Sequence, residues 1–158
     1  MFHLPAYELG ILFTLAGYYL RAKSQYASAG DYIIRAIRTL SAALGPEDPI
    51  IMKTRHCLVH ICHGADRYEE AEDIFRVLIS YYSYNTGGGH AQVFIVSSHL
   101  SNMLRVQKRR GEAEEHALRA VLGLEAVHSV DVKHLLNSKR TLSTILGERG
   151  HKEESSKI

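Results

Sequence analysis

Apolar residues recur at steps of three and four along most of the chain, which is the spacing of one face of an α-helix. The first stripe of this kind runs through Leu9, Leu12, Phe13, Ala16 and Leu20. Similar stripes follow at regular distances. The pattern predicts seven helices, at about 6–23, 26–43, 49–63, 68–84, 91–107, 110–126 and 132–147.

The stripes repeat with a period of 42 residues, and such a period is typical of stacked structural repeats. Ala29, Ala71 and Ala113 stand at this interval. A small residue at a fixed position indicates that two helices cross closely there. The same register holds at Leu20, Cys62, Leu104 and Leu146. The repeat therefore predicts an all-α fold, a stack of antiparallel helical hairpins with no sheet.

Glycine and proline mark the ends of the predicted hairpins. Gly45, Pro46 and Pro49 end the first hairpin, and the glycine triplet at 87–89 ends the second. A degenerate fourth copy begins at Lys152, where KEES overlays YEEA of the second copy. We therefore expect a single domain over 1–158. Its repeat units are expected at about 6–45, 49–87, 91–128 and 132–158, the last one incomplete.

The composition fits a folded protein of modest charge. Hydrophobic residues make up 46% of the chain and the formal net charge is +2, which neither indicates nucleic acid nor excludes an acidic partner. Cys57 and Cys62 would lie about 140° apart around a helix, so we expect reduced thiols and a cytoplasmic location. The apolar opening from Leu9 to Leu20 lacks a basic leader and is too short to span a bilayer. We therefore expect neither a secretory signal nor a membrane partner.

The residues around the turns resemble the tetratricopeptide repeats of kinesin light chains. The resemblance is carried by LGPEDP at 44–49, Leu58 and RYEEAE at 67–72. The opening LAGYYLRAKSQYASA is similar to first repeats found behind the NTPase domain of microbial NB-ARC receptor-like proteins. The resemblance implies a right-handed superhelical α-solenoid. It also implies that the protein binds a peptide or protein as a scaffold or sensor and that it is not an enzyme. No GxxxxGK[ST] motif occurs, so an NTPase would belong to a parent or partner chain.

In this family the first helices form the concave wall of the groove, at fixed positions on one stripe. The resemblance places the following residues there: Thr14, Tyr18, Arg21, His56, His60, His63, Ser98, Asn102, Arg105, Arg140 and Thr144. The stripe contains no acid, whereas the acids gather on second helices and turns. We therefore expect an acidic peptide or protein segment as the ligand. Its binding should weaken with salt, and it should strengthen from about pH 7.5 to 5.5, where ordinary histidines gain charge.

Two other function classes stay open. His56, His60 and His63 share one helical face at spacings of four and three, so they could chelate zinc or copper in a metal-binding protein or metal-dependent enzyme. A catalytic zinc site usually needs a third ligand beside such a histidine pair and a nearby carboxylate, and the neighbouring helices offer neither in register. We therefore expect no metal, no cofactor and no catalytic residues. The basic run at 108–110 could touch RNA phosphates. Because no aromatic side chains are interleaved with it, we expect a solvated turn and no nucleic-acid partner.

Overall fold

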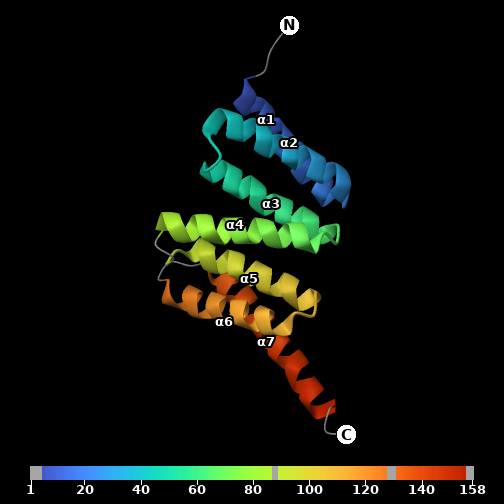
Figure 1. Cartoon of the computed structure of the whole chain (residues 1–158), viewed down its shortest axis with the longest axis vertical. Helices are drawn as coiled ribbons and strands as arrows, with labels where there is room; N and C mark the ends of the chain where they lie inside the picture. The colour runs from blue at the N-terminus through green and yellow to red at the C-terminus, as the bar shows by residue number, and fades with distance from the viewer. Residues whose placement is uncertain (1–4, 87–88, 128–130, 156–158) are drawn as a thin grey trace. The chain divides into compact units, whose positions relative to one another are not determined.

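The structure is a computed structural model that describes residues 5–86, 89–127 and 131–155, without the side chains of 86, 149 and 151–155. Within these ranges it contains helices and no strand (Figure 1). The all-α fold class is therefore confirmed. The seven helices found there are α1 (Ala6–Ala22), α2 (Tyr26–Leu44), α3 (Pro49–Gly64), α4 (Tyr68–Thr86), α5 (Ala91–Val106), α6 (Arg110–Ala126) and α7 (Val132–Ser155).

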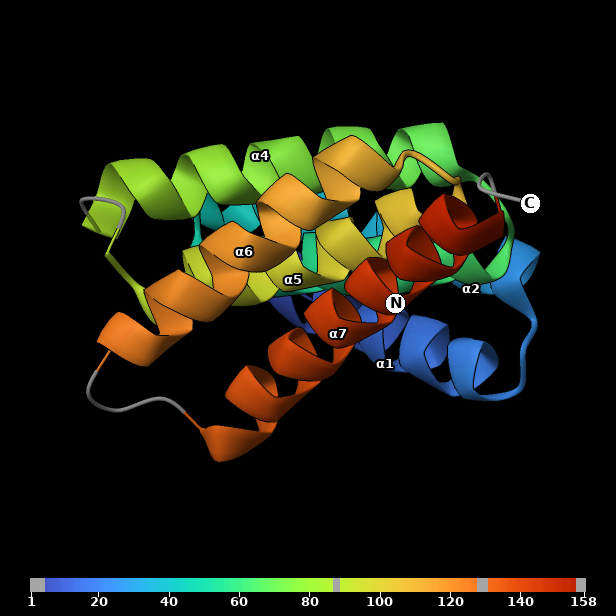
Figure 2. The same ribbon diagram turned by 90° about the horizontal axis from the view of Figure 1, so that it is seen from below.

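The chain divides into two compact units, residues 1–78 and 79–158. In the first unit α1 and α2 form an antiparallel hairpin, and α3 packs against α2 (Figure 1). In the second unit α5 and α6 form the equivalent hairpin, and α7 packs against both of them (Figure 2). None of the described helices combines the length and apolar content that a membrane span requires. The single domain and the right-handed superhelix stay predictions.

The turn inside each hairpin has the same backbone geometry in three copies. Ser24, Asp66 and Lys108 stand 42 residues apart, and their φ angles are 58°, 57° and 64°. The N–H of the following residue returns to a carbonyl five residues earlier, which is the Schellman arrangement of a helix C-terminus. These bonds measure 2.9 Å for Gln25 to Leu20, 2.8 Å for Arg67 to Cys62 and 3.0 Å for Arg109 to Leu104. The 42-residue register is therefore present in the backbone itself.

Small residues bring the paired helices close together, as predicted. Ala29, Ala71 and Ala113 are all fully buried. In the first hairpin, a Cβ added to Gly17 would lie 3.3 Å from the carbonyl oxygen of Ala29. In the third, the Ser101 hydroxyl donates to the carbonyl oxygen of Ala113 at 2.7 Å. Gly17 and Ser101 hold the same register position, so the close crossing recurs in equivalent hairpins.

The ends of the helices between hairpins follow the local sequence. Gly45 ends α2 with a φ of 92°, a conformation that glycine adopts without steric cost. Asp48 then caps α3 by accepting a 2.8 Å hydrogen bond from the Ile50 N–H, and Pro49 occupies the first helical position. Gly87 and Gly88, which were predicted to end the second hairpin, lie outside the described residues, as do the predicted unit ends at 87, 128 and 158.

Helix α7 corrects one prediction. The sequence predicted a helix at about 132–147 and the start of a degenerate fourth copy at Lys152, whereas α7 runs without a break to Ser155. Gly150 holds the register position of Ser24, Asp66 and Lys108, yet it is helical. In the earlier copies a second helix follows this turn and packs on the first. Over the described part of α7 no helix folds back in this way, and its glutamates and lysines are good helix formers.

Candidate functional site

The predicted stripe coincides with two hollows, one within each unit. The α1–α3 hollow measures about 310 Å³ and is lined by Tyr18, Arg21, Lys53, His56, Cys57 and His60. The α5–α7 hollow measures about 350 Å³ and is lined by Ser98, His99, Asn102, Arg105, Asn137, Arg140, Thr141 and Thr144. All residues of the predicted stripe except Thr14 and His63 therefore line one of the two hollows.

The α1–α3 hollow is built from one face of each helix. Tyr18 and Arg21 lie three residues apart on α1, whereas the α3 residues follow the i, i+3, i+4, i+7 pattern of a single helical face. This pattern begins at Lys53, which the sequence interpretation missed although it stands three residues before His56. Cys57 was missed as well. The rings of His56 and His60 stack with their centroids 5.1 Å apart.

Cationic groups and hydrogen-bond donors dominate this hollow. Arg21 and Lys53 carry permanent charges, and no carboxylate lies among the lining residues. The Arg21 Nε atom is buried, and it has no hydrogen-bond partner among the described residues. A buried donor of this kind is uncommon in folded proteins, because losing its water costs free energy that a partner would restore. The hollow is therefore suited to a ligand that supplies anionic oxygen atoms.

Burial sets the protonation states of the side chains in this hollow. It raises the pKa of the Cys57 thiol to about 11, against the opposing charge of Arg21. Burial also raises the pKa of Tyr18, and nearby Cys57 adds to this effect. Both groups therefore stay protonated and uncharged at pH 7. Neither adds negative charge beside Arg21.

His60 corrects the predicted pH dependence. Burial of the ring, followed by the positive charges of His56, Arg21 and His63, lowers the pKa of His60 to about 4. The sequence interpretation assumed that all three histidines keep ordinary values and gain charge between about pH 7.5 and 5.5. His60 stays neutral through that range, so it does not contribute to the predicted increase in positive charge.

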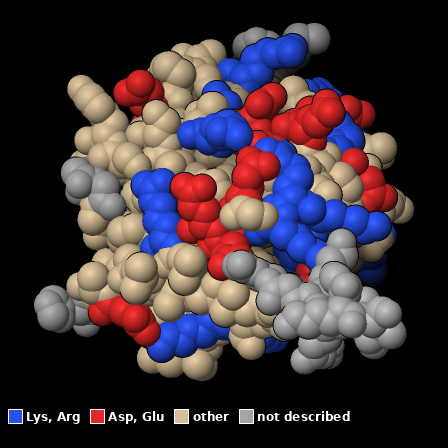
Figure 3. All heavy atoms as spheres, turned by 60° about the horizontal axis from the view of Figure 1, so that its bottom comes forward, with Lys and Arg blue, Asp and Glu red and all other residues tan. Residues whose placement is uncertain are grey.

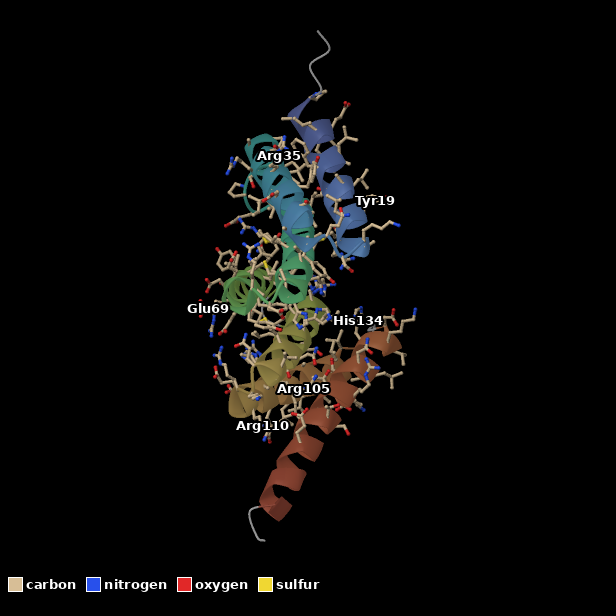
Figure 4. The ribbon with its side chains drawn as sticks, turned by 90° about the vertical axis from the view of Figure 1, so that its right-hand side faces the viewer. Tyr19, Arg35, Glu69, Arg105, Arg110 and His134 are labelled. Carbon is tan, nitrogen blue, oxygen red and sulfur yellow. The ribbon has the colours of Figure 1, made fainter. Side chains whose placement is uncertain are left out.

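The α5–α7 hollow is also polar, and one of its two arginines has a carboxylate partner. Arg105, labelled in Figure 4, donates from Nη1 to Glu148 Oε1 at 2.7 Å, and from Nε and Nη2 to Asn102 Oδ1 at 3.3 Å each. Arg140 donates to Asn137 at 3.3 Å. The stripe itself contains no acid, but Glu148 stands one helical turn after its last member and reaches Arg105. The charge of Arg105 is therefore compensated by an acid from outside the stripe.

Thr14 and His63 lie outside the hollows. Thr14 is buried, and its hydroxyl donates to the carbonyl oxygen of Gly10 at 2.9 Å, within α1. The ring of His63 packs edge-on against Tyr68 with their centroids 5.7 Å apart. The three histidines proposed as a metal-binding set are thus divided, because two of them stack on each other and the third packs against Tyr68.

The basic turn at 108–110 contains an internal ion pair. Arg109 pairs with Glu112 at 2.6 Å. A second pair in the same unit joins Lys139 to Glu125 at 2.6 Å. Figure 3 shows basic and acidic side chains interspersed over the face that it displays. The solvated turn and the absence of a nucleic-acid partner stay predictions.

The comparisons with known proteins concern the fold. No family model matches the sequence, and neither does any curated protein. Among solved structures, the chain is similar to the crystal structure of BtubC (BKLC) from P. vanneervenii, with a TM-score of 0.82 over 95% of this chain. The chain has the fold of a kinesin-light-chain-like tetratricopeptide-repeat protein. The resemblance predicted from the sequence is thereby confirmed for the fold.

The likeness to BtubC is structural, since the two sequences are 17% identical. The aligned part covers 60% of the BtubC chain. At this level of identity the shared tetratricopeptide-type fold does not identify the ligand. What the present chain binds therefore has to follow from the side chains in its own hollows.

Proposed function

We propose that the chain is a protein-interaction module that binds an extended peptide or protein segment of net negative charge, without catalysing a reaction. The observation that carries this proposal is the α1–α3 hollow, where Arg21 and Lys53 meet no lining carboxylate. Opposite charge in a partly desolvated hollow favours association and selects against basic partners. A tetratricopeptide-type fold supports a protein partner in general terms.

The α5–α7 hollow contributes a different kind of contact. Its lining includes the side-chain amides of Asn102 and Asn137, together with several hydroxyl groups. An amide both donates and accepts, so it matches the N–H and C=O groups of an extended peptide backbone. In this proposal the second unit offers hydrogen bonds to a peptide backbone, whereas the first unit offers contacts to acidic side chains.

The same module is proposed to serve as the scaffolding or sensing part of a larger assembly in the cytoplasm. Both cysteines are buried and unpaired, as expected in a reducing compartment. We expect the repeats to be associated with an NTPase domain, either in a longer parent chain or in a partner chain. Such a chain would supply the switching activity for which no nucleotide-binding motif is present here.

Peptide display against the purified chain tests the proposal. Selected peptides should be enriched in Asp and Glu, and their affinity should fall as salt rises, because exposed charges are screened beyond about 10 Å at 0.1 M. Arg21→Gln should weaken the selected peptides, whereas Arg119→Gln, an exposed change on α6, should not. Selection of uncharged peptides, or equal effects of the two variants, would refute the acidic-segment proposal.

A further inference from the structure

We propose that the α1–α3 hollow is a phosphate-monoester site that receives a phosphoserine or phosphothreonine side chain of the bound segment. This inference rests on the proposed function, since it specifies which acidic group the first unit selects. Carboxylates of Asp and Glu are the alternative ligands. The charge, the donor geometry and the contrast with the second hollow all favour the phosphate.

The charge of the hollow matches a dianion. Arg21 and Lys53 bring two permanent positive charges to one lining, from α1 and α3. A phosphate monoester carries about −1.5 to −2 at pH 7 and presents three strong acceptor oxygens. A carboxylate carries one charge on two oxygens. Two cations without a carboxylate beside them are therefore more fully neutralised by a phosphate.

The available donors also favour a group with three oxygen atoms. The Arg21 Nε–H is buried without a partner among the described residues, and the guanidinium carries further donors in a planar fork. The Lys53 ammonium and the Tyr18 hydroxyl add donors from either side of the hollow. Charge-assisted hydrogen bonds from these groups would be the strongest contacts available to an anion. A phosphate group has enough acceptor oxygens for donors from Arg21, Lys53 and Tyr18.

The neutral residues of the hollow do not oppose a dianion. Cys57 stays a thiol and Tyr18 a phenol at pH 7, because burial raises the pKa of both. In the α5–α7 hollow, by contrast, Arg105 already has Glu148 at 2.7 Å and Asn102 as partners. A phosphate there would have to compete with a carboxylate that belongs to the protein. Among the described lining residues, the α1–α3 hollow therefore has two cations without a carboxylate partner, whereas the α5–α7 hollow has one, Arg140, which donates to the Asn137 amide.

Nuclear magnetic resonance of the full chain tests the inference with two small probes, N-acetyl-O-phosphoserine amide and N-acetyl-glutamate amide. We expect the phosphoserine probe to shift the Arg21 Nε–H resonance and to bind about tenfold more tightly than the glutamate probe, because it adds a second charge and a third acceptor. Lys53→Gln, an exposed change that leaves the fold intact, should abolish this preference. Arg140→Gln, in the other hollow, should preserve it.

The outcomes separate this inference from the proposed function. Equal affinities for the two probes at the α1–α3 hollow would overturn the phosphate site and still agree with an acidic segment. A phosphoserine probe that leaves the Arg21 and Lys53 resonances unchanged would also overturn it. The proposed function is decided independently, by the selected peptides and the Arg21→Gln and Arg119→Gln pair. Retention of the phosphate preference in Lys53→Gln would show that the preference arises elsewhere.

Discussion

The close crossing of α1 and α2 gives the most direct test of the structure, through the substitution Gly17→Ala. A Cβ at Gly17 would lie 2.5 Å from Cγ1 and 2.6 Å from Cδ1 of Ile33. Ile33 is fully buried, so its side chain has little room to move away. Overpacking of this kind costs about 1–3 kcal/mol. It opposes the gain of about 1 kcal/mol that alanine brings over glycine inside a helix.

Gly30→Ala is the matched control in the same unit. Gly30 lies within α2, and the nearest atoms to an added Cβ, on Arg67 and Ile61, are 3.7 Å away, an ordinary contact distance. The helix-propensity gain is common to both variants and cancels in their difference. We therefore expect Gly17→Ala to be less stable than Gly30→Ala by about 1–3 kcal/mol, which is the overpacking cost alone.

Urea unfolding followed by circular dichroism measures this difference, and hydrogen exchange shows where it occurs. Because the chain has two compact units, the unfolding curve need not be a single transition. The amides of residues 5–78 should lose protection in Gly17→Ala, whereas those of the second unit report only global changes. Equal stability of the two variants would show that Gly17 is not packed against Ile33 at this crossing.

Two further predictions concern the turns and the histidines. Lys108 has a φ of 64°, a backbone conformation that is costly for a residue with a Cβ. Lys108→Gly should therefore raise the unfolding free energy by about 0.5–1 kcal/mol, as measured by urea unfolding. A loss of stability would contradict a strained turn. The pKa of His60 is lowered to about 4, so the unfolded chain binds a proton that the folded chain does not as the pH falls from about 6.5 to 4. The stability that His60 contributes is therefore present above this window and is lost within it. His60→Gln should reduce the acid-induced loss of unfolding free energy by about 1 kcal/mol, which is less than the full pKa shift implies because the ring is partly exposed. His134→Gln is the control. An unchanged pH profile of the melting temperature would contradict this.

The sequence predicted the helices, crossings and turns correctly wherever the same local packing recurs in each copy. Ala29, Ala71 and Ala113 occupy equivalent crossings, and Ser24 and Asp66 occupy equivalent turns, so each copy supports the interpretation of the others. Period and apolar spacing together are enough to locate such helices, since they reflect the same packing in every hairpin. Helix α7 escaped this reasoning. Gly150 holds the register position of the earlier turns, yet it is helical in α7.

The chemistry of the hollows was harder to predict, because it depends on neighbours that are distant in sequence. Glu148 lies on α7 and pairs with Arg105 on α5, a contact that neither helix reveals alone. The lowered pKa of His60 arises from partial burial of the ring, from His56 on the same helix and from the charge of Arg21 on α1. Lys53 is a different case, because its spacing from His56 already placed it on the lining face. Lys53 lies one turn before the stripe that the family resemblance implies, so the resemblance alone does not point to it.

The repeat also explains why two hollows of similar construction differ in chemistry. Equivalent positions of the two hollows stand 84 residues apart, and they hold Tyr18 and Asn102, Lys53 and Asn137, and His56 and Arg140. Packing constrains the small and apolar residues of the hairpin, and it leaves these lining positions free to vary. One hollow therefore keeps uncompensated cations from Arg21 and Lys53, while Glu148 and Asn102 engage one arginine of the other. A ligand that contacts both units would meet charge recognition in the first and hydrogen bonding to its backbone in the second. Arg21→Gln and Arg105→Gln should therefore lower the affinity for an acidic segment by unequal amounts, with the larger loss of affinity in Arg21→Gln.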